Sequence, residues 1–152
     1  DCQEFLRKLS AKLTALTATL PTEAEWEYAC RAGSTMKYCF GDEAKGLGDY
    51  AWYKDNSREQ THPVGKKEAN AWELYDMHGN VWEWCQDWFG KYRGASPEKD
   101  PTGTEAGQSR VLRGGSWYYF ATYCRSASRN GYAPSGRGAY YGFRAALRGG
   151  AD

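Results

Sequence analysis

The sequence predicts an α+β domain in which two helices pack on short antiparallel strands that are joined by many long loops. Three observations support this fold class. Two segments near the start have apolar residues at helical spacing, a later segment alternates with period two, and the connecting stretches are rich in Gly, Pro and polar residues. The 152 residues are the usual length of one domain, so we expect residues 1–152 to form a single unit.

The first helix is expected from Asp1 to Leu13. Its apolar residues return every three or four positions, which places them on one face of a helix that must pack on another element. These residues are Cys2, Phe5, Leu6, Leu9 and Leu13. The threonine-rich residues 14–20 that follow are expected to form a connector.

The second helix lies in LPTEAEWEYACRAG, Leu20 to Gly33, and both of its ends are marked in the sequence. Thr22 can cap the N-terminus, and Glu25, three residues later, completes a capping box. Gly33 provides the usual stop signal. The residues expected to face the core are Trp26, Ala29 and Cys30.

Residues 34–71 show no regular pattern and are expected to be loops that Tyr50, Trp52 and Tyr53 pin to the core. Residues 81–89 alternate, with Trp82, Trp84 and Trp88 on one side, which predicts a strand.

A polar loop rich in Gly and Pro is expected over residues 90–108. Two short strands are then expected at Arg110–Trp117 and Gly142–Leu147. The segment between these two strands is expected to be long and loop-rich.

The last third of the chain is basic and aromatic. Residues 1–105 carry 18 acidic and 13 basic side chains, whereas residues 106–152 carry 1 acidic and 7 basic ones. Residues 110–147 contain six tyrosines among Gly and Ser, which is the composition of an adaptable binding surface. A basic aromatic surface can also bind nucleic acid. Here, however, every basic residue is an arginine, and most of these arginines lie beside Gly or Ser, so we expect arginines that tie loops together and no nucleic-acid partner.

Several classes of protein are excluded or disfavoured by composition. The mean hydropathy of -0.82 excludes a transmembrane segment. Five cysteines occur without a CxxC pair, and His62 and His78 lack ligand spacing, so a zinc site is not favoured. One or two disulfides and buried free cysteines both remain open.

Three groups of motifs occur together in this chain. They are LPTEAEWEYACRAG at residues 20–33, HPVG with NAWELYDMHGNVWEWCQDW at residues 62–88, and RVLRGGSW, CRSASR and GFRAAL within residues 110–147. In combination they resemble the formylglycine-generating, sulfatase-modifying family, whose fold is a variant of the C-type lectin fold. The resemblance covers nearly the whole chain. The family's opening strands have no counterpart here, so we expect the N-terminal part of the family fold to be absent.

The resemblance implies an enzyme only if the family's catalytic positions are kept, and on that ground we expect no catalysis here. Enzymes of the family bind copper(I) through two cysteines spaced five apart, in the segment after GGS and an aromatic residue. Here the second cysteine corresponds to Cys124, but the first corresponds to Tyr119. Soft copper(I) prefers sulfur ligands, so a single thiolate cannot form the two-sulfur site and no copper is expected. Cys124 is then expected to be structural or a disulfide partner.

The resemblance also implies a structural calcium site. In the family the segment around W-E-W supplies a side-chain oxygen, two backbone carbonyls and a glutamate to calcium. The corresponding residues here are Asp76, Gly79, Val81 and Glu83. An all-oxygen ligand set suits a hard cation. Alternatively, Asp76 only caps a turn and Glu83 pairs with an arginine.

A further resemblance is to the variable proteins of diversity-generating retroelements, whose lectin-type domain ends in this kind of segment. A frame that includes GGSW, CRSA and GFR encloses fifteen positions, none of which is Lys, Gln, Glu, Met or Trp. Scrambling the adenines of AAY asparagine codons cannot reach those five residue types. We call these the variable positions: Tyr118, Tyr119, Phe120, Thr122, Tyr123, Ser128, Asn130, Gly131, Tyr132, Ala133, Gly136, Gly138, Ala139, Tyr140 and Tyr141.

The predicted function is that of a non-catalytic ligand-binding protein, in which residues 110–147 display a variable tyrosine-rich surface to a protein or glycan partner. Consecutive aromatic residues cannot all be buried, so some must form an exposed patch. Tyr123 and Tyr132 are candidates for the core. The expected binding hot spots are Tyr118, Tyr119, Tyr132, Tyr140 and Tyr141. The alternatives are a copper-dependent oxidase and a fixed interaction subunit, and the resemblance implies a cell-surface, extracellular or phage-borne location.

Overall fold

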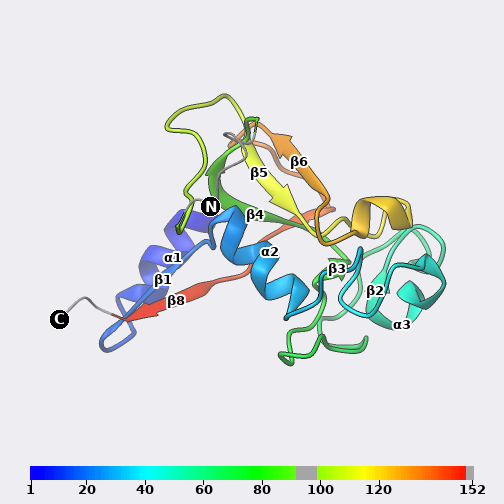
Figure 1. Ribbon diagram of the computed structural model, residues 1–152. Helices are drawn as coiled ribbons and strands as arrows, with labels where there is room; N and C mark the ends of the chain where they lie inside the picture. Colours follow the sequence, from blue (N-terminus) through cyan, green and yellow to red (C-terminus); the bar gives the residue numbers. More distant parts are fainter. Residues whose placement is uncertain (92–98, 150–152) are drawn as a thin grey trace.

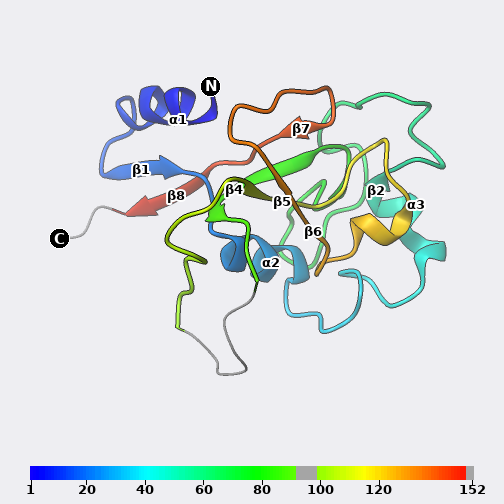
Figure 2. The same ribbon diagram turned by 90° about the horizontal axis from the view of Figure 1, so that it is seen from above.

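We describe residues 1–91 and 99–149 of a computed structural model of the chain. Both views place α1 and its neighbours at one end of the molecule and α3 at the other (Figures 1 and 2). The elements are α1 (Cys2–Ser10), β1 (Leu16–Thr19), α2 (Glu23–Arg31), η1 (Ala44–Gly46), α3 (Leu47–Tyr50), β2 (Ala51–Trp52), β3 (His78–Gly79), β4 (Trp82–Trp88), β5 (Arg110–Arg113), η2 (Ala121–Cys124), β6 (Arg129–Tyr132), β7 (Tyr141–Gly142) and β8 (Ala146–Gly149).

The predicted α+β class is confirmed, but the strands are not all antiparallel. The largest sheet has the order β6-β5-β4-β7, in which β7 pairs with β4 in parallel. The two short strands β2 and β3 also pair in parallel. These parallel pairs could not be predicted from local periodicity, because they join segments far apart in the chain and periodicity carries no sign of strand direction.

Helix α2 forms as the sequence predicts. The Thr22 side chain accepts from the backbone N–H of Glu25, and the Glu25 carboxylate accepts from the backbone N–H of Thr22. The left-handed turn that ends the helix is at Ala32, with φ 46°, and continues at Gly33. Trp26 and Cys30 are buried, and Ala29 packs beside them.

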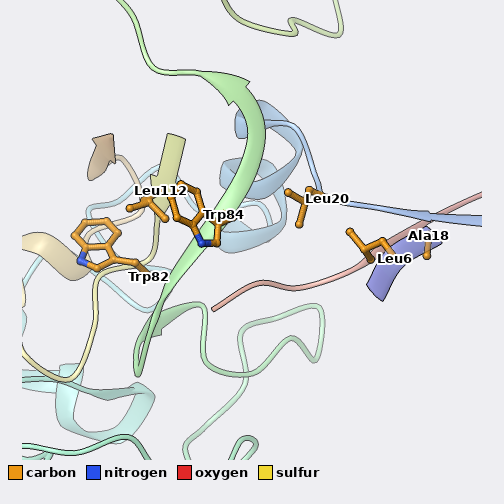
Figure 3. Packing of buried hydrophobic residues seen from close by; sticks show 6 residues of the cluster. All are labelled: Leu6, Ala18, Leu20, Trp82, Trp84 and Leu112. Carbon is orange, nitrogen blue, oxygen red and sulfur yellow. The ribbon is translucent and has the colours of Figure 1, made fainter. Parts of the chain in front are cut away.

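Strand β4 is covered on both faces, and the predicted alternation decides which residue enters which core. Trp82 and Trp84 face a cluster that runs through Leu112 and Leu20 to Leu6 and Ala18 beside α1 (Figure 3). Cys85, two residues on from Glu83, faces α2 and packs in a second cluster with Trp26 and Cys30. Because both faces of β4 are buried, this strand positions α2 on one side and the cluster that reaches α1 on the other.

Two expectations for the start of the chain were wrong. Residues 16–19 are not a connector but strand β1, which pairs antiparallel with β8 in the register Leu16↔Gly149 to Thr19↔Ala146. The partner strand lies at the far end of the chain, so no local signal revealed it. Helix α1 ends at Ser10, and Phe5 is 53% exposed, although its ring contacts that of Phe143 at a centroid distance of 5.5 Å.

The predicted strands near the end of the chain are shorter than expected. Strand β5 ends at Arg113 because Gly114 and Gly115 have φ of 95° and 76°. A Cβ at Gly115 would lie 2.7 Å from the Sγ of Cys124, so this close approach requires glycine. The predicted strand at Gly142–Leu147 is divided between β7 and β8, and the segment before it contains η2 and β6, which were not predicted.

The long loops are pinned by aromatic side chains, as predicted. The Tyr50 ring stacks on Phe40 at a centroid distance of 4.4 Å, and the Trp52 ring stacks on His62 at 3.8 Å. The predicted loop at residues 90–108 is irregular where it is described, and its residues 92–98 lie outside the described part. Among the described residues, no helix is long and apolar enough to cross a membrane.

Candidate binding surface and cation site

Arginines of the C-terminal block hold the strands to α2, as predicted. Arg113 on β5 is fully buried and pairs with Glu23 at 3.2 Å and with Glu27 of α2. Its second Nη also donates to the carbonyl of Ser126 at 2.7 Å. Arg129 on β6 forms a two-point contact with Glu23. These charges fix the segment that carries the variable positions to the scaffold.

None of the variable positions is buried. The exposed ones are Tyr118, Phe120, Thr122, Tyr123, Tyr132, Ala133, Gly138 and Ala139. The partly buried ones are Tyr119, Ser128, Asn130, Gly131, Gly136, Tyr140 and Tyr141. Within residues 114–144, which run from GGSW to GFR, the buried residues are Gly114, Gly115, Ser116, Cys124 and Ser126, and all of them belong to the frame. The expectation that Tyr123 and Tyr132 enter the core is wrong, since they are 47% and 43% exposed.

The six tyrosines form one connected array, which we call the tyrosine surface. It consists of Tyr118, Tyr119, Tyr123, Tyr132, Tyr140 and Tyr141. Neighbouring rings lie 4.7 to 6.2 Å apart along the path 123–119–118–140–141–132. Most pairs are edge-to-face, which is a favourable arrangement for aromatic rings. Tyrosines that precede β6 in the chain are thereby brought together with tyrosines that follow it.

The scaffold supports the tyrosine surface from below. The ring of Tyr119 lies edge-on to the buried Trp82, and Tyr141 lies 5.7 Å from Trp84. Burial raises the pKa of Tyr141 to about 12 and also raises the pKa of Tyr119, so both phenols are neutral hydrogen-bonding groups at physiological pH. The expected hot spots therefore divide into exposed rings, such as Tyr118, and rings anchored on the core.

Glycines at variable positions make room for neighbouring rings. A Cβ at Gly136 would lie 2.2 Å from the Tyr132 ring, and a Cβ at Gly131 would lie 2.5 Å from Phe89. A larger residue at position 136 must therefore displace the ring at position 132. Because both are variable positions, their side chains jointly set the shape of this part of the surface.

A groove that is lined in part by Tyr141 opens beside the tyrosine surface. It has a volume of about 730 Å³. Its lining includes Trp84, Arg110, Gly136, Arg137 and Phe143. The tyrosine surface thus continues from an exposed aromatic array into a concave region.

Lys54 was not predicted, yet it lies at the rim of the tyrosine surface. Its backbone N–H donates to the carbonyl of Tyr119 at 3.0 Å, and its Nζ lies 4.2 Å above the Phe120 ring. The buried Ser57 also donates to the carbonyl of Trp117 at 2.8 Å. No local pattern identifies Lys54, because it belongs to a loop more than sixty residues before the block it contacts.

The position of the family's copper ligands does not fit copper(I). Tyr119, which the resemblance matches to the first thiolate, offers a neutral phenol. Cys124 is fully buried, and burial raises the pKa of its thiol to about 12, so the thiolate form is suppressed at neutral pH. All five cysteines are free, and Cys30, Cys85 and Cys124 are buried. Of the two possibilities left open, buried free thiols is the one observed.

His78 connects three segments below the surface. Its Nδ1 donates to the carbonyl of Cys124 at 2.7 Å, and its Nε2 accepts from the backbone N–H of Cys39 at 3.2 Å. This pattern requires the neutral imidazole. Burial lowers the pKa of His78 to about 4, although the hydrogen bond to the carbonyl acts in the opposite direction. His78 is therefore a structural group in this fold.

The side chains of the predicted calcium ligands contact other protein groups, with Glu83 paired to an arginine. Asp76 Oδ2 accepts from the backbone N–H of Gly65 at 2.7 Å, whereas Asp76 Oδ1 is buried without a partner among the described residues. Glu83 forms a two-point pair with Arg144 at 2.7 and 2.8 Å and accepts from Trp26 Nε1.

Of the two predicted ligand side chains, only Asp76 has an oxygen without a hydrogen-bond partner among the described residues. The unpartnered carboxylate oxygen needs a positive or donor group, while Glu83 has most of its acceptor capacity in use. Gly79 and Val81 would contribute only backbone carbonyls. Within residues 1–91 and 99–149, no group of three or more His, Cys, Asp or Glu side chains could hold a metal ion.

Comparison with known proteins places this scaffold in a family. Residues 1–148 match the Sulfatase-modifying factor enzyme 1-like domain. The chain is 41% identical over 143 residues to the formylglycine-generating enzyme of Streptomyces coelicolor, covering 84% of this chain and 46% of that enzyme. It is 39% identical over 132 residues to serine/threonine-protein kinase pkn1 of Chlamydia pneumoniae, covering 84% and 20%.

Solved structures agree with this assignment. Treponema denticola variable protein 1 superposes with a TM-score of 0.82 at 43% identity, covering 86% of this chain and 47% of that protein. PvdO from Pseudomonas aeruginosa superposes with a TM-score of 0.86 at 33% identity, covering 98% and 59%. The chain spans less than half of the length of each of these two curated relatives. It belongs to the formylglycine-generating, sulfatase-modifying family and has that family's variant of the C-type lectin fold.

Proposed function

We propose that the chain is a non-catalytic ligand-binding protein, the variable protein of a diversity-generating retroelement. One observation carries this proposal. All fifteen variable positions are accessible, while the buried residues within residues 114–144 belong to the frame. Most variable positions can therefore change with little effect on the core, which is what a diversified binding surface requires. Tyr119 and Tyr141 are exceptions, because their rings pack against the buried Trp82 and Trp84.

The similarity to Treponema denticola variable protein 1 supports the proposal. The relatives also include proteins named as an enzyme and as a protein kinase, so the fold alone does not determine the function. The distinguishing evidence is the site itself. Tyrosines give rigid contact area at low entropic cost, and six of them meet in one array here. The proposed partner is a protein or a glycan, and the proposed setting is a cell, extracellular or phage surface.

An oxidase activity is not favoured by the residues at the corresponding site. Copper(I) needs two soft ligands, and the pair Tyr119 and Cys124 offers one buried thiol with a raised pKa. The ring of Tyr119 is instead part of the tyrosine surface, between Tyr118 and Tyr123. We therefore assign Tyr119 to binding and Cys124 to the core.

We also propose a structural calcium ion at Asp76. At a calcium concentration one hundred times the Kd, binding should stabilise the fold by about 2.7 kcal/mol, which raises the Tm of a domain of this size by roughly 5–10 °C. Thermal unfolding in calcium and in chelator measures this shift. The variant Asp76→Asn should lose it and Glu73→Gln, an exposed control in the same turn, should keep it. Equal Tm values in calcium and chelator would contradict the proposal.

The binding proposal is tested by separating stability from recognition. Four exposed aromatic residues, Tyr118, Phe120, Tyr123 and Tyr132, are replaced together by serine. Because surface replacements cost about 0.5 kcal/mol or less each, we expect the free energy of unfolding to fall by no more than about 2 kcal/mol. Binding to peptides selected from a displayed library against the parent protein should be lost.

The matched control is Trp82→Ser, which removes a fully buried ring and should cost about 3–5 kcal/mol. Chemical denaturation and biosensor binding supply the two readouts. Full retention of binding by the quadruple variant would remove the tyrosine surface as the recognition site.

A further inference from the structure

Two fixed cations border the tyrosine surface. Lys54 lies over Phe120, and its loop is attached to the segment by the hydrogen bonds of Lys54 and Ser57. At the Tyr123 end, Arg125 is exposed, and its Nε donates to the carbonyl of Thr122 at 2.8 Å. Neither residue is a variable position. Their charges therefore remain when the surrounding side chains change.

These two cations differ from most of the arginines in residues 106–149. Arg113, Arg129, Arg144 and Arg148 are each paired with a glutamate of the scaffold. Arg137 pairs with Asp1, and Arg110, which has no carboxylate partner among the described residues, lies over the Trp88 ring instead. Among the described residues, neither Lys54 nor Arg125 has a carboxylate partner, and Asp55, which follows Lys54 in the chain, forms no ion pair with it. Residues 106–149 contain no acidic side chain at all. The tyrosine surface is thus bordered by positive charge that the fold does not neutralise.

From this arrangement we infer that the tyrosine surface recognises an acidic segment of a protein partner, with Lys54 and Arg125 as fixed charge-selecting residues. This inference rests on the proposed binding function and specifies its partner. Tyrosine and arginine are the residues enriched in the centres of protein interfaces. Sugar hydroxyls are donors as well as acceptors, and a block without carboxylates offers them few charged acceptors. The chemistry therefore favours a polypeptide with carboxylates over a neutral glycan.

The physical role of the two cations is to speed association with acidic segments and to oppose association with basic ones. Charges at the rim of an interface change the association rate and its salt dependence more than the final contact energy. The variable positions would then set which acidic segment fits, while Lys54 and Arg125 exclude basic ones. Such a division of labour keeps one selection rule constant across changing surfaces.

The test begins with a yeast-displayed library of fifteen-residue peptides in which acidic and basic residues are equally frequent. Peptides are selected against the full chain and kept only if binding is lost with Tyr118→Ser and Tyr140→Ser together. We expect these peptides to carry net negative charge. If they are neutral or basic, the inference fails while the binding function stands. If no peptide depends on the tyrosines, the proposed function fails as well.

The second step measures the rates for the best selected peptide. The double variant Lys54→Glu and Arg125→Glu should associate about 10- to 100-fold more slowly at low salt, and the difference should shrink in 0.5 M NaCl. The control is Lys12→Glu with Lys45→Glu, the same charge change at exposed sites elsewhere. Lys54→Gln with Arg125→Gln gives a smaller effect of the same sign. Equal rates for the parent and both rim variants would overturn the inference, as would tyrosine-dependent binding of heparin with no peptide binder.

Discussion

Replacing Arg113 with alanine is expected to lower the free energy of unfolding by about 3–5 kcal/mol, because it breaks a buried ion pair and leaves partners behind. The side chain is fully buried and contacts Glu23, Glu27 and the carbonyl of Ser126. Glu23 keeps Arg129, and Glu27 keeps Arg31, but the space of the guanidinium and the bond to the carbonyl are lost. The contacts of β5 with α2 and with the variable segment should therefore weaken at the same time.

Urea unfolding of the parent, Arg113→Ala and Arg113→Lys measures this effect. Lysine keeps the charge but cannot bridge the same acceptors in the fork geometry of arginine, so an intermediate loss is expected. The matched control is Arg125→Ala, which removes an exposed guanidinium and should change the free energy by about 0.5 kcal/mol or less. If the two alanine variants were equally stable, Arg113 would not be the residue that holds the segment to the scaffold.

Stability is also expected to fall as the pH drops from about 6.5 to about 4. The pKa of His78 is about 4 in the folded chain, compared with its ordinary value of 6.5, because burial disfavours the imidazolium. Between these values the unfolded chain binds a proton at this site and the folded chain does not. The contribution of His78 to the free energy of unfolding is therefore fully present above the higher pKa. It is lost as the pH falls toward the lower pKa, by about 3 kcal/mol in total.

Other groups change stability in the same range, so the prediction concerns a difference between variants. Burial raises the pKa of Asp87, which stabilises the folded state on acidification and acts against the effect of His78. In His78→Gln the contribution of the imidazole is absent. We expect the free energy of unfolding of the parent to decrease more steeply than that of the variant between pH 6.5 and 4. Parallel curves from urea unfolding at several pH values would show that His78 does not stay neutral in the fold.

The sequence identified what depends on local signals. Helix α2 carries its own start and stop, from the capping box at Thr22 and Glu25 to the turn at Gly33. The alternation of β4 also correctly separated Trp82 and Trp84 from Cys85. These features depend on neighbours within a few residues, so a single sequence contains them.

Features that depend on distant partners were missed. Strand β1 is defined by β8, about 130 residues later, and β7 joins β4 in parallel across the whole variable segment. The same limit applies to the candidate site. The sequence correctly predicted that some tyrosines are exposed, whereas the variability of the fifteen positions stays a prediction. It could not show that the rings of Tyr132 and Tyr141 meet, or that Lys54 reaches the Phe120 ring.

The central claim is that the fifteen variable positions form a diversified binding surface on a fixed scaffold. The most direct test is the DNA sequence of the native gene over residues 106–152 and immediately downstream. We expect pyrimidine-ending codons at the variable positions, together with a nearby near-copy that has AAY at those codons. Ordinary mixed codons and no near-copy would contradict the claim, and the tyrosine surface would then be a fixed interface of a sulfatase-modifying-factor relative.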